Sequence, residues 1–232
     1  MNLSSFEVLT FDCYGTLIDW ESGILRAVQR VLAAHGRELP PAEILEHFAR
    51  FESTIQAGPY LTYREVLSRV VDEFGRKLGF APSPGERASL PESIAHWVPF
   101  DDTVPALRVL GSRYRLAVIS NVDDDLFAFS ARRLGVEFDE VVTARQVGSY
   151  KPDARNFELA IERLGVPLDA ILHVAQSLFH DLAPAKRLGF ATVHVNRVSP
   201  HGGSGATMPV SARPDLEVPD LGTLAEMVLA EE

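Results

Sequence analysis

The chain has 232 residues, of which 46% are hydrophobic, and its formal net charge is −10. This hydrophobic content suffices to bury a full core, so the composition indicates a globular protein with one large domain or a core carrying a small insertion. The 22 Lys and Arg residues are never clustered and are outnumbered by 32 Asp and Glu residues. The charge balance therefore argues against nucleic acid as a partner.

The amino-terminal residues lack a basic start followed by a long apolar run. No stretch approaches the roughly 20 apolar residues that span a bilayer. The single cysteine, Cys13, excludes an intramolecular disulfide and supplies no cysteine cluster for zinc. We therefore expect a cytoplasmic protein with no membrane partner.

Short apolar runs that end in small or polar residues mark buried parallel strands. Such runs occupy residues 6–11, 116–120, 171–175 and 192–195, with a shorter candidate at 138–143. Segments with helical periodicity lie between them, at residues 124–134, 154–164 and 181–188. Alternating strands and helices build a parallel sheet with helices on both faces, so we predict a doubly wound, Rossmann-like α/β core.

One stretch interrupts this alternation, because the pattern is helical almost throughout residues 21–97. It predicts three or four helices inserted after the first strand, over the carboxyl ends of the strands, where open α/β sheets bind ligands. We therefore predict a catalytic core formed by residues 1–20 and 98–232 and a helical cap formed by the insertion. Pro, Gly and Ser are frequent in residues 199–219, which predicts a long irregular loop before a final helix at 221–230.

The strongest chemical signal stands at the end of the first predicted strand. The segment LTFDCYGTL places Asp12 directly after a buried run and before Gly15, which tolerates a tight backbone turn. A lone Asp at a strand end is more often a cap of the turn or of the following helix. Other polar side chains, however, follow the other predicted strands: Ser120, Asn121, Lys151, Gln176, Ser177 and Asp181. Since the carboxyl ends of parallel strands share one edge of the sheet, this convergence predicts an active site.

The order of these residues resembles the four motifs of the haloacid dehalogenase superfamily. The matching elements are Asp-x-x-x-Thr at Asp12 and Thr16, Ser-Asn at Ser120, Lys-Pro at Lys151, and a polar strand end followed by Asp181. The resemblance covers nearly the whole chain. It implies a hydrolase with a Rossmann-like core, an inserted helical cap and a carboxylate nucleophile.

The resemblance also implies a role for each matched residue. Asp12 would be the nucleophile, Thr16 would orient it, and Lys151 would keep the Asp12 carboxylate ionised and offset developing charge. The pair Ser120–Asn121 would hold the substrate carboxylate through hydrogen bonds. Asp181, together with Lys151, would position or activate the hydrolytic water.

Two departures from the phosphatase pattern point to the type II 2-haloacid dehalogenase branch. Phosphatase members carry an Asp two residues after the nucleophile to protonate the leaving alkoxide, and this chain has Tyr14 there. The usual first Asp of the fourth motif is Gln176, so an amide replaces one of the oxygen ligands that Mg²⁺ would need. The segment FDCYGTLIDW is instead similar to metal-independent 2-haloacid dehalogenases, whose halide leaving group needs no proton. We therefore expect neither a metal nor another cofactor.

The reaction implied by the resemblance is a two-step hydrolysis of a small 2-substituted carboxylic acid, such as an (S)-2-haloacid. Asp12 would displace the group on C2 from the back face, and water would then attack the carbonyl carbon of the resulting ester. A cap Arg would meet the halide or the carboxylate. Arg50 is the best candidate, with Arg37 and Arg64 as alternatives, although an Arg on a helix is more often a solvated surface charge.

Further substrate contacts are expected from Tyr14, Trp20, Phe157, Gln176 and Ser177. Aromatic residues are core residues more often than site residues, which is the competing interpretation for Trp20 and Phe157. The dehalogenases carry Tyr where Phe157 stands, so a hydroxyl used by that family is absent here. His180, next to Asp181, is a further acid–base candidate.

Two other functions stay open at this point. The FDCYGTLIDW segment and the SLxHD fourth motif also resemble a ring-opening hydrolase that acts on azetidine-2-carboxylate, in which a strained C–N bond breaks and the nitrogen needs a proton. A Mg²⁺-dependent phosphatase, or a catalytically silent binding protein with the same fold, is the other alternative. The sequence does not decide whether the chain forms a homodimer.

Overall fold

The computed structural model describes residues 1–202 and 205–231. The chain forms two compact units. We call the first the core unit; it consists of Met1–Asp19, Val98–Val198 and Val210–Glu232. We call the second the helical unit; it consists of Trp20–Trp97 and Ser199–Pro209.

The core unit contains a six-stranded sheet in which every neighbouring pair of strands is parallel. Its strands are β1 (Val8–Phe11), β2 (Arg115–Ser120), β3 (Glu140–Thr143), β4 (Ile171–Ala175), β5 (Ala191–Val195) and β6 (Leu216–Val218). Their order across the sheet is β3-β2-β1-β4-β5-β6. The chain runs outward from β1 in one direction and from β4 in the other, so the order reverses between these two strands. In open α/β sheets, ligands bind beyond the carboxyl ends of the strands at such a reversal.

The predicted doubly wound α/β fold is therefore confirmed, and all five predicted strands are present. The sixth strand, β6, was missed, because its three residues LEV carry no apolar run and lie in the stretch predicted as an irregular loop. It pairs with β5 through Val193 and Leu216. Residues 203 and 204 of that predicted loop lie outside the described residues.

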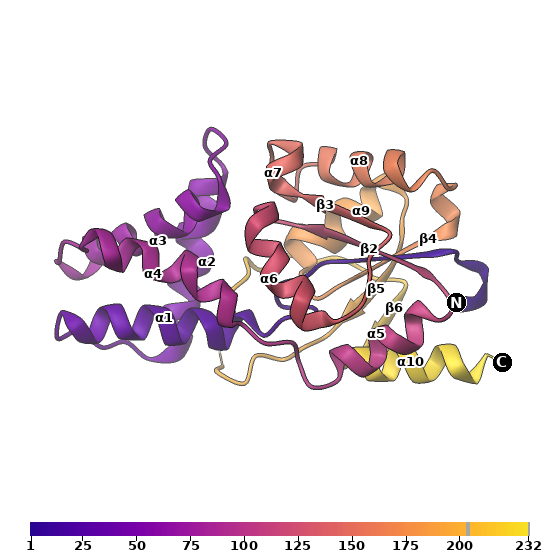
Figure 1. The fold of residues 1–232 in the computed structure, drawn as a ribbon, viewed down its shortest axis with the longest axis horizontal. Helices are drawn as coiled ribbons and strands as arrows, with labels where there is room; N and C mark the ends of the chain where they lie inside the picture. Colours follow the sequence, from indigo (N-terminus) through magenta and orange to yellow (C-terminus); the bar gives the residue numbers. More distant parts are fainter. Residues whose placement is uncertain (203–204, 232) are drawn as a thin grey trace. The chain divides into compact units, whose positions relative to one another are not determined.

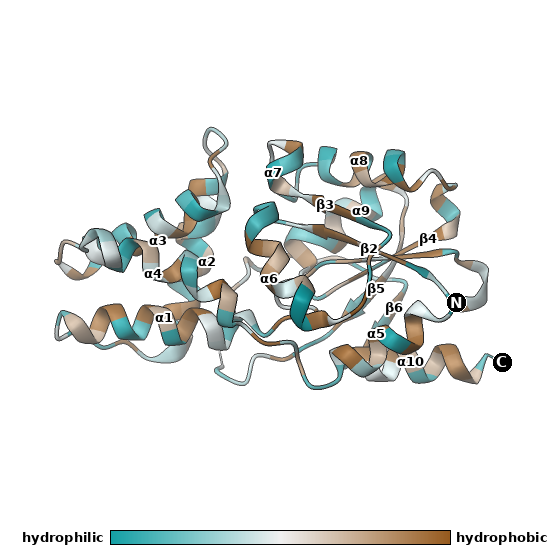
Figure 2. Cartoon of the chain, viewed as in Figure 1, coloured by the Kyte–Doolittle hydropathy of each residue, from teal (hydrophilic) through white to brown (hydrophobic). Residues whose placement is uncertain are grey.

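Helices cover both faces of the sheet in the core unit (Figure 1). They are α5 (Thr103–Gly111), α6 (Asp124–Leu134), α7 (Ala144–Val147), α8 (Arg155–Leu164), α9 (Ala183–Leu188) and α10 (Leu221–Ala230). Helices α5 and α10 lie side by side on one face, and α8 packs on the other. Phe157, Ala160 and Leu164 of α8 share one hydrophobic cluster with Val8 of β1 and Ile119 of β2. Figure 2 shows hydrophobic colour along the strands and mixed colours on α8, as expected for a helix with one buried face.

Short helical turns complete the core and the helical unit. They are the 3₁₀ turns Leu3–Ser5, Ile94–His96 and Leu168–Ala170 and the π-helical turn Leu178–Leu182. The helix predicted to begin at Asp181 thus begins earlier, as this π turn, and continues as α9.

The helical unit contains α1 (Trp20–Ala34), α2 (Pro41–Gln56), α3 (Tyr63–Leu78) and α4 (Pro84–Ser93). Helices α3 and α4 each begin with a capping box, which Thr62 forms with Glu65 and Ser83 forms with Glu86. Ser199–Pro209, which the sequence analysis placed in the core, groups with this unit. The reason is that the Glu21 carboxylate accepts hydrogen bonds from Ser199 Oγ (2.6 Å) and Ala206 N (3.0 Å).

Candidate active site

The turn that follows β1 presents Asp12 at the carboxyl edge of the sheet. Gly15 adopts a φ of 94°, which favours glycine, and its N–H donates to Ile18 O at 2.8 Å. The backbone N–H of Asp12 donates to Val174 O of β4 at 3.2 Å, so the turn is tied to the neighbouring strand. Thr16 Oγ1 donates to Asp12 Oδ2 at 2.8 Å. Asp12 is therefore held in one orientation and is only 6% exposed.

Lys151 joins the two carboxylates of the site. Its ammonium donates to Asp12 Oδ1 at 2.9 Å, to Asp181 Oδ1 at 2.6 Å and to Ile119 O at 2.7 Å. All three ammonium protons are thus engaged, and the Lys151 side chain is 1% exposed. Three residues that follow different strands therefore meet at one point, as the sequence predicted from their positions at strand ends.

The two carboxylates share one positive charge in a buried setting. Burial raises the pKa of Asp12, Lys151 lowers it, and the nearby Asp181 charge raises it again, so it lies above the ordinary value. Burial also opposes ionisation of Asp181, but Lys151 and a hydrogen bond from His173 outweigh it and hold the Asp181 pKa below its usual range. Burial alone would lower the pKa of Lys151, and the two carboxylates raise it instead. The arrangement favours an ionised Asp181 beside a protonated Lys151.

The Asn121 side chain contacts the Lys151 backbone. Its side-chain Nδ2 donates to Lys151 O at 3.1 Å, and its Oδ1 accepts from Lys151 N at 2.7 Å. Both ends of the amide are therefore engaged with the Lys151 backbone. The second proton of Nδ2 is not used by this pair, so the predicted contact with a substrate carboxylate stays a prediction.

Two buried oxygen atoms in the site lack a hydrogen-bond partner among the described residues. They are Ser120 Oγ and Asp181 Oδ2. Leaving a buried polar atom without a partner costs roughly 1–3 kcal/mol, so such atoms commonly mark the position of a bound water or ligand. These two atoms are therefore the best candidates to contact a substrate group and a water molecule.

In the fourth motif, Gln176 contacts its neighbours through its backbone and Ser177 does so through its hydroxyl. Gln176 N donates to Thr16 Oγ1 at 2.9 Å, and Gln176 O lies 3.1 Å from His194 Nε2. Ser177 caps the π-helical turn by accepting from His180 N at 3.0 Å. Burial lowers the pKa of His180 to about 4, so its imidazole is neutral at pH 7. This loop thus holds the Asp12 turn against β4.

Several residues predicted to bind substrate have other contacts. The Tyr14 hydroxyl lies 3.0 Å from Ser130 Oγ on α6. Phe157 is fully buried in the hydrophobic cluster beneath α8, so it has a packing role. Trp20 and Arg50 belong to the helical unit, where Trp20 packs edge-on against Phe48 and Arg50 is exposed on α2. The competing interpretation of Phe157 as a core residue, and of Arg50 as a solvated charge, agrees with these placements.

Sequence reasoning missed His173 and Thr10, because both lie inside runs that were taken only as buried strands. His173 Nε2 lies 3.2 Å from Asp181 Oδ1, and His173 Nδ1 lies 2.9 Å from Thr10 Oγ1. The available signal was the His itself in ILHVA, because a polar residue in a strand buried on both faces needs hydrogen-bond partners.

The residues of this site do not fit a Mg²⁺ ion. Mg²⁺ prefers several oxygen ligands, but Asp12 and Asp181 already share the Lys151 ammonium, and an amide stands at Gln176. Within residues 1–202 and 205–231, no three His, Cys, Asp or Glu side chains are grouped so as to hold a metal ion.

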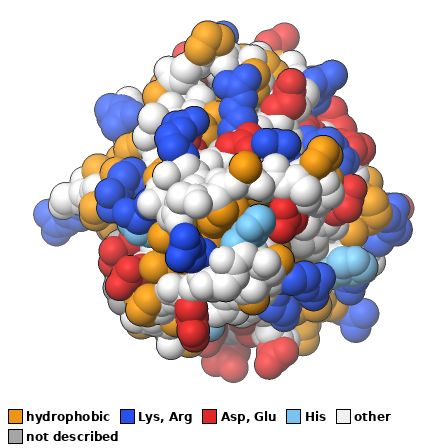
Figure 3. All heavy atoms as spheres, turned by 90° about the vertical axis from the view of Figure 1, so that its left-hand side faces the viewer, with side chains coloured by type: hydrophobic (Ala, Val, Ile, Leu, Met, Phe, Trp, Pro, Cys, Tyr) orange, Lys and Arg blue, Asp and Glu red, His pale blue; other side chains and the backbone are white. Residues whose placement is uncertain are grey.

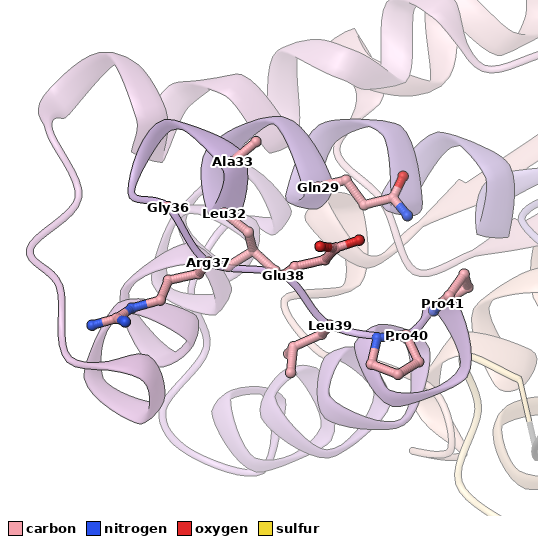
Figure 4. A pocket seen from close by; sticks show the side chains of 9 residues that line it. All are labelled: Gln29, Leu32, Ala33, Gly36, Arg37, Glu38, Leu39, Pro40 and Pro41. Carbon is pink, nitrogen blue, oxygen red and sulfur yellow. The ribbon is translucent and has the colours of Figure 1, made fainter.

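A hollow lies in the helical unit and differs in character from the site around Lys151 (Figure 4). It has a volume of about 890 Å³ and is lined by residues from the end of α1 to the start of α2. Arg37 points away from the other labelled side chains, which leaves Gln29 and Glu38 as its main polar groups. Glu38 is the carboxylate among its lining residues.

On the face shown in Figure 3, Lys and Arg side chains are interspersed with Asp and Glu. No helix of the described chain is both long and apolar enough to cross a membrane.

Comparisons with known proteins identify the family of the chain. The family model described as haloacid dehalogenase-like hydrolase matches residues 6–189. The chain is 26% identical over 231 residues to an (S)-2-haloacid dehalogenase of Pseudomonas putida, which covers 98% of this chain and 100% of that protein. It is 27% identical over 222 residues to an (S)-2-haloacid dehalogenase of Pseudomonas sp. strain YL, with 94% and 93% covered.

The fold also matches a solved L-2-haloacid dehalogenase from Xanthobacter autotrophicus. The TM-score is 0.80 at 23% identity, with 97% of this chain and 98% of that chain covered. The chain therefore belongs to the haloacid dehalogenase-like hydrolases. The predicted family, and its resemblance to the 2-haloacid dehalogenase branch, are confirmed.

Proposed function

We propose that the chain hydrolyses small (S)-2-haloacids through an ester formed on Asp12, with the helical unit acting as a cap. The observation that carries this proposal is the arrangement around Lys151. One ammonium holds Asp12 and Asp181, and Asp181 Oδ2 has no hydrogen-bond partner among residues 1–202 and 205–231. The names of the relatives supply the substrate class.

In the first step, a carboxylate oxygen of Asp12 attacks C2 of the substrate from the face opposite the halogen. The C–O bond forms, the C–halogen bond breaks, and the halide leaves with the bonding electrons. Ester formation removes the negative charge of Asp12, which relieves its repulsion with Asp181 while Lys151 stays paired. The halide needs no proton, which fits the presence of Tyr14 where phosphatases carry an acid.

In the second step, water attacks the carbonyl carbon of the Asp12 ester. Asp181 is the base, because it is held ionised and its Oδ2 has no partner among the described residues. It takes a proton from the water and returns one to the oxygen of the departing 2-hydroxy acid. Lys151 offsets the charge that develops on the tetrahedral intermediate. Ser120 Oγ, which is buried and has no partner in the described part of the chain, binds the substrate carboxylate in the first step.

A substrate panel tests this proposal. Both enantiomers of 2-chloropropionate, azetidine-2-carboxylate and a simple phosphate ester are assayed with and without excess EDTA. We expect chloride release from the (S) enantiomer at a rate that EDTA leaves unchanged, because the site residues do not fit a metal ion. Activity restricted to phosphate esters and strictly dependent on Mg²⁺ would overturn the proposal.

A further inference from the structure

His173 is a polar residue that lies among buried aromatic side chains of the core unit. It lies in β4 and is completely buried. Its ring packs edge-on against Phe157 and Phe190, with centroids 5.4 and 6.1 Å away. Burying an imidazole among apolar groups costs free energy unless both ring nitrogens have hydrogen-bond partners. A buried His173 therefore needs a hydrogen-bond partner for each ring nitrogen.

Both ring nitrogens have such partners in the core unit. His173 Nε2 lies 3.2 Å from Asp181 Oδ1, and His173 Nδ1 lies 2.9 Å from Thr10 Oγ1. Thr10 is the register partner of His173 across the parallel pair β1 and β4, so the sheet itself sets this contact. A carboxylate only accepts hydrogen bonds, so Nε2 must carry the proton and donate to Asp181. In the neutral ring Nδ1 is then an acceptor, and the Thr10 hydroxyl donates to it.

The pair fixes which oxygen of Asp181 remains available. Oδ1 receives hydrogen bonds from Lys151 Nζ at 2.6 Å and from His173, whereas Oδ2 has no partner among the described residues. A carboxyl held by Lys151 alone could rotate about its Cβ–Cγ bond, because one donor does not fix its plane. The rigid imidazole, fixed by Thr10 and by two aromatic neighbours, provides the second point of attachment.

We propose that Thr10 and His173 form a positioning pair that aims Asp181 Oδ2 at the water that hydrolyses the ester on Asp12. This inference rests on the proposed function, because it assigns the pair to the second chemical step of that reaction. It predicts that loss of the pair slows ester hydrolysis and leaves ester formation nearly unchanged.

Rapid-quench single turnovers with (S)-2-chloropropionate separate the two steps. Chloride reports ester formation, and the adduct on the peptide containing Asp12 reports ester hydrolysis. His173→Phe keeps the aromatic packing but loses the donor, so chloride should appear at nearly the wild-type rate while the adduct decays about 10- to 100-fold more slowly. His173→Gln retains an N–H donor and should restore most of the decay rate, whereas Thr10→Val should give an intermediate loss. Equal slowing of both steps in His173→Phe would overturn the inference.

A measurement without substrate tests the same pair if the proposed reaction itself fails. The side-chain carboxyl carbon of Asp181, followed by ¹³C NMR during a pH titration, reports the hydrogen bond from His173. In His173→Phe the pKa of Asp181 should rise, because a donor that lowers it has been removed. His173→Gln should bring the pKa back toward the wild-type value. An unchanged titration in both variants would show that His173 does not hold Asp181, whatever the substrate is.

Discussion

The core unit and the helical unit bury acidic side chains in opposite ways. In the core unit, Asp12 and Asp181 are buried against the Lys151 ammonium. In the helical unit, Glu52 is 3% exposed, and the neutral Tyr63 hydroxyl donates to Glu52 Oε1 at 2.7 Å. Burial without a cation raises the pKa of Glu52 to about 7, whereas the pKa of Asp181 is lowered. The comparison shows that a counter-charge can outweigh burial, as Lys151 does for Asp181, whereas the pKa of Asp12, which shares the same cation, stays raised. We place the chemistry at this shared cation.

The formal charge is also divided unequally between the core unit and the helical unit. Acidic and basic residues nearly balance in the helical unit, so nearly all of the formal charge of −10 belongs to the core unit. The buried cation at Lys151 therefore sits in the more acidic of the two units. Its two contacting carboxylates, Asp12 and Asp181, stabilise its protonated form, so Lys151 is the residue whose loss should matter most.

Lys151→Ala should have the largest effect, a loss of about three orders of magnitude or more in turnover, because two buried carboxylates lose their shared cation. Lys186→Ala is the matched control, since Lys186 pairs with Asp215 at the partly exposed surface and should leave turnover unchanged. Initial rates of halide release, with circular dichroism to verify folding, provide the measurement. A folded Lys151→Ala protein that retains turnover and is merely less stable would make Lys151 a structural ion pair.

Glu52→Gln should change stability by up to about 3 kcal/mol in a direction that depends on pH. The folded pKa of about 7 exceeds the ordinary Glu pKa of 4.5. Between these two pH values the unfolded chain has released the proton and the folded chain has not, so stability falls as pH rises. The variant lacks this loss and should therefore gain stability relative to wild type at pH 8 but not at pH 4.

Urea unfolding of both proteins at pH 4 and pH 8 measures this difference. Glu43→Gln is the control, because Glu43 is exposed on the same helix, α2. An equal effect of Glu52→Gln at both pH values would show that folding does not raise the pKa of Glu52, and the contrast between the two units would be lost.

Asn121→Ala should have the smallest effect, a loss of about tenfold in turnover, because it removes two hydrogen bonds that fix the Lys151 backbone. The loss should appear in kcat with little change in KM, since both of these hydrogen bonds go to the Lys151 backbone. A large rise in KM with unchanged kcat would instead support direct binding of the substrate carboxylate.

The strand ends could be predicted from the sequence, because each buried run stops at a polar residue and parallel strands share an edge. This placed Asp12, Lys151 and Asp181 together correctly. The direction of individual side chains could not be predicted in the same way. Asn121 turns toward the Lys151 backbone, and Phe157 turns into the core, because packing within the folded unit decides both.

His173 and β6 show two further limits of the sequence. His173 stands in a run whose neighbours are all apolar, and its partner Thr10 becomes adjacent only through the register of β1 and β4. Strand β6 is too short to show a period, and it exists because β5 offers it an edge. Both features depend on contacts between distant segments, which a single sequence does not display.

The covalent step on Asp12 is the central claim of this account, and an oxygen-isotope experiment tests it most directly. A single turnover with excess protein in H₂¹⁸O should give a 2-hydroxy acid that carries ordinary oxygen, because that oxygen comes from Asp12. Multiple turnovers should leave heavy oxygen in the peptide that contains Asp12, and Asp12→Asn should lack turnover. Single-turnover product carrying solvent oxygen, with no label on Asp12, would show that water attacks the substrate directly and that Asp12 is a general base.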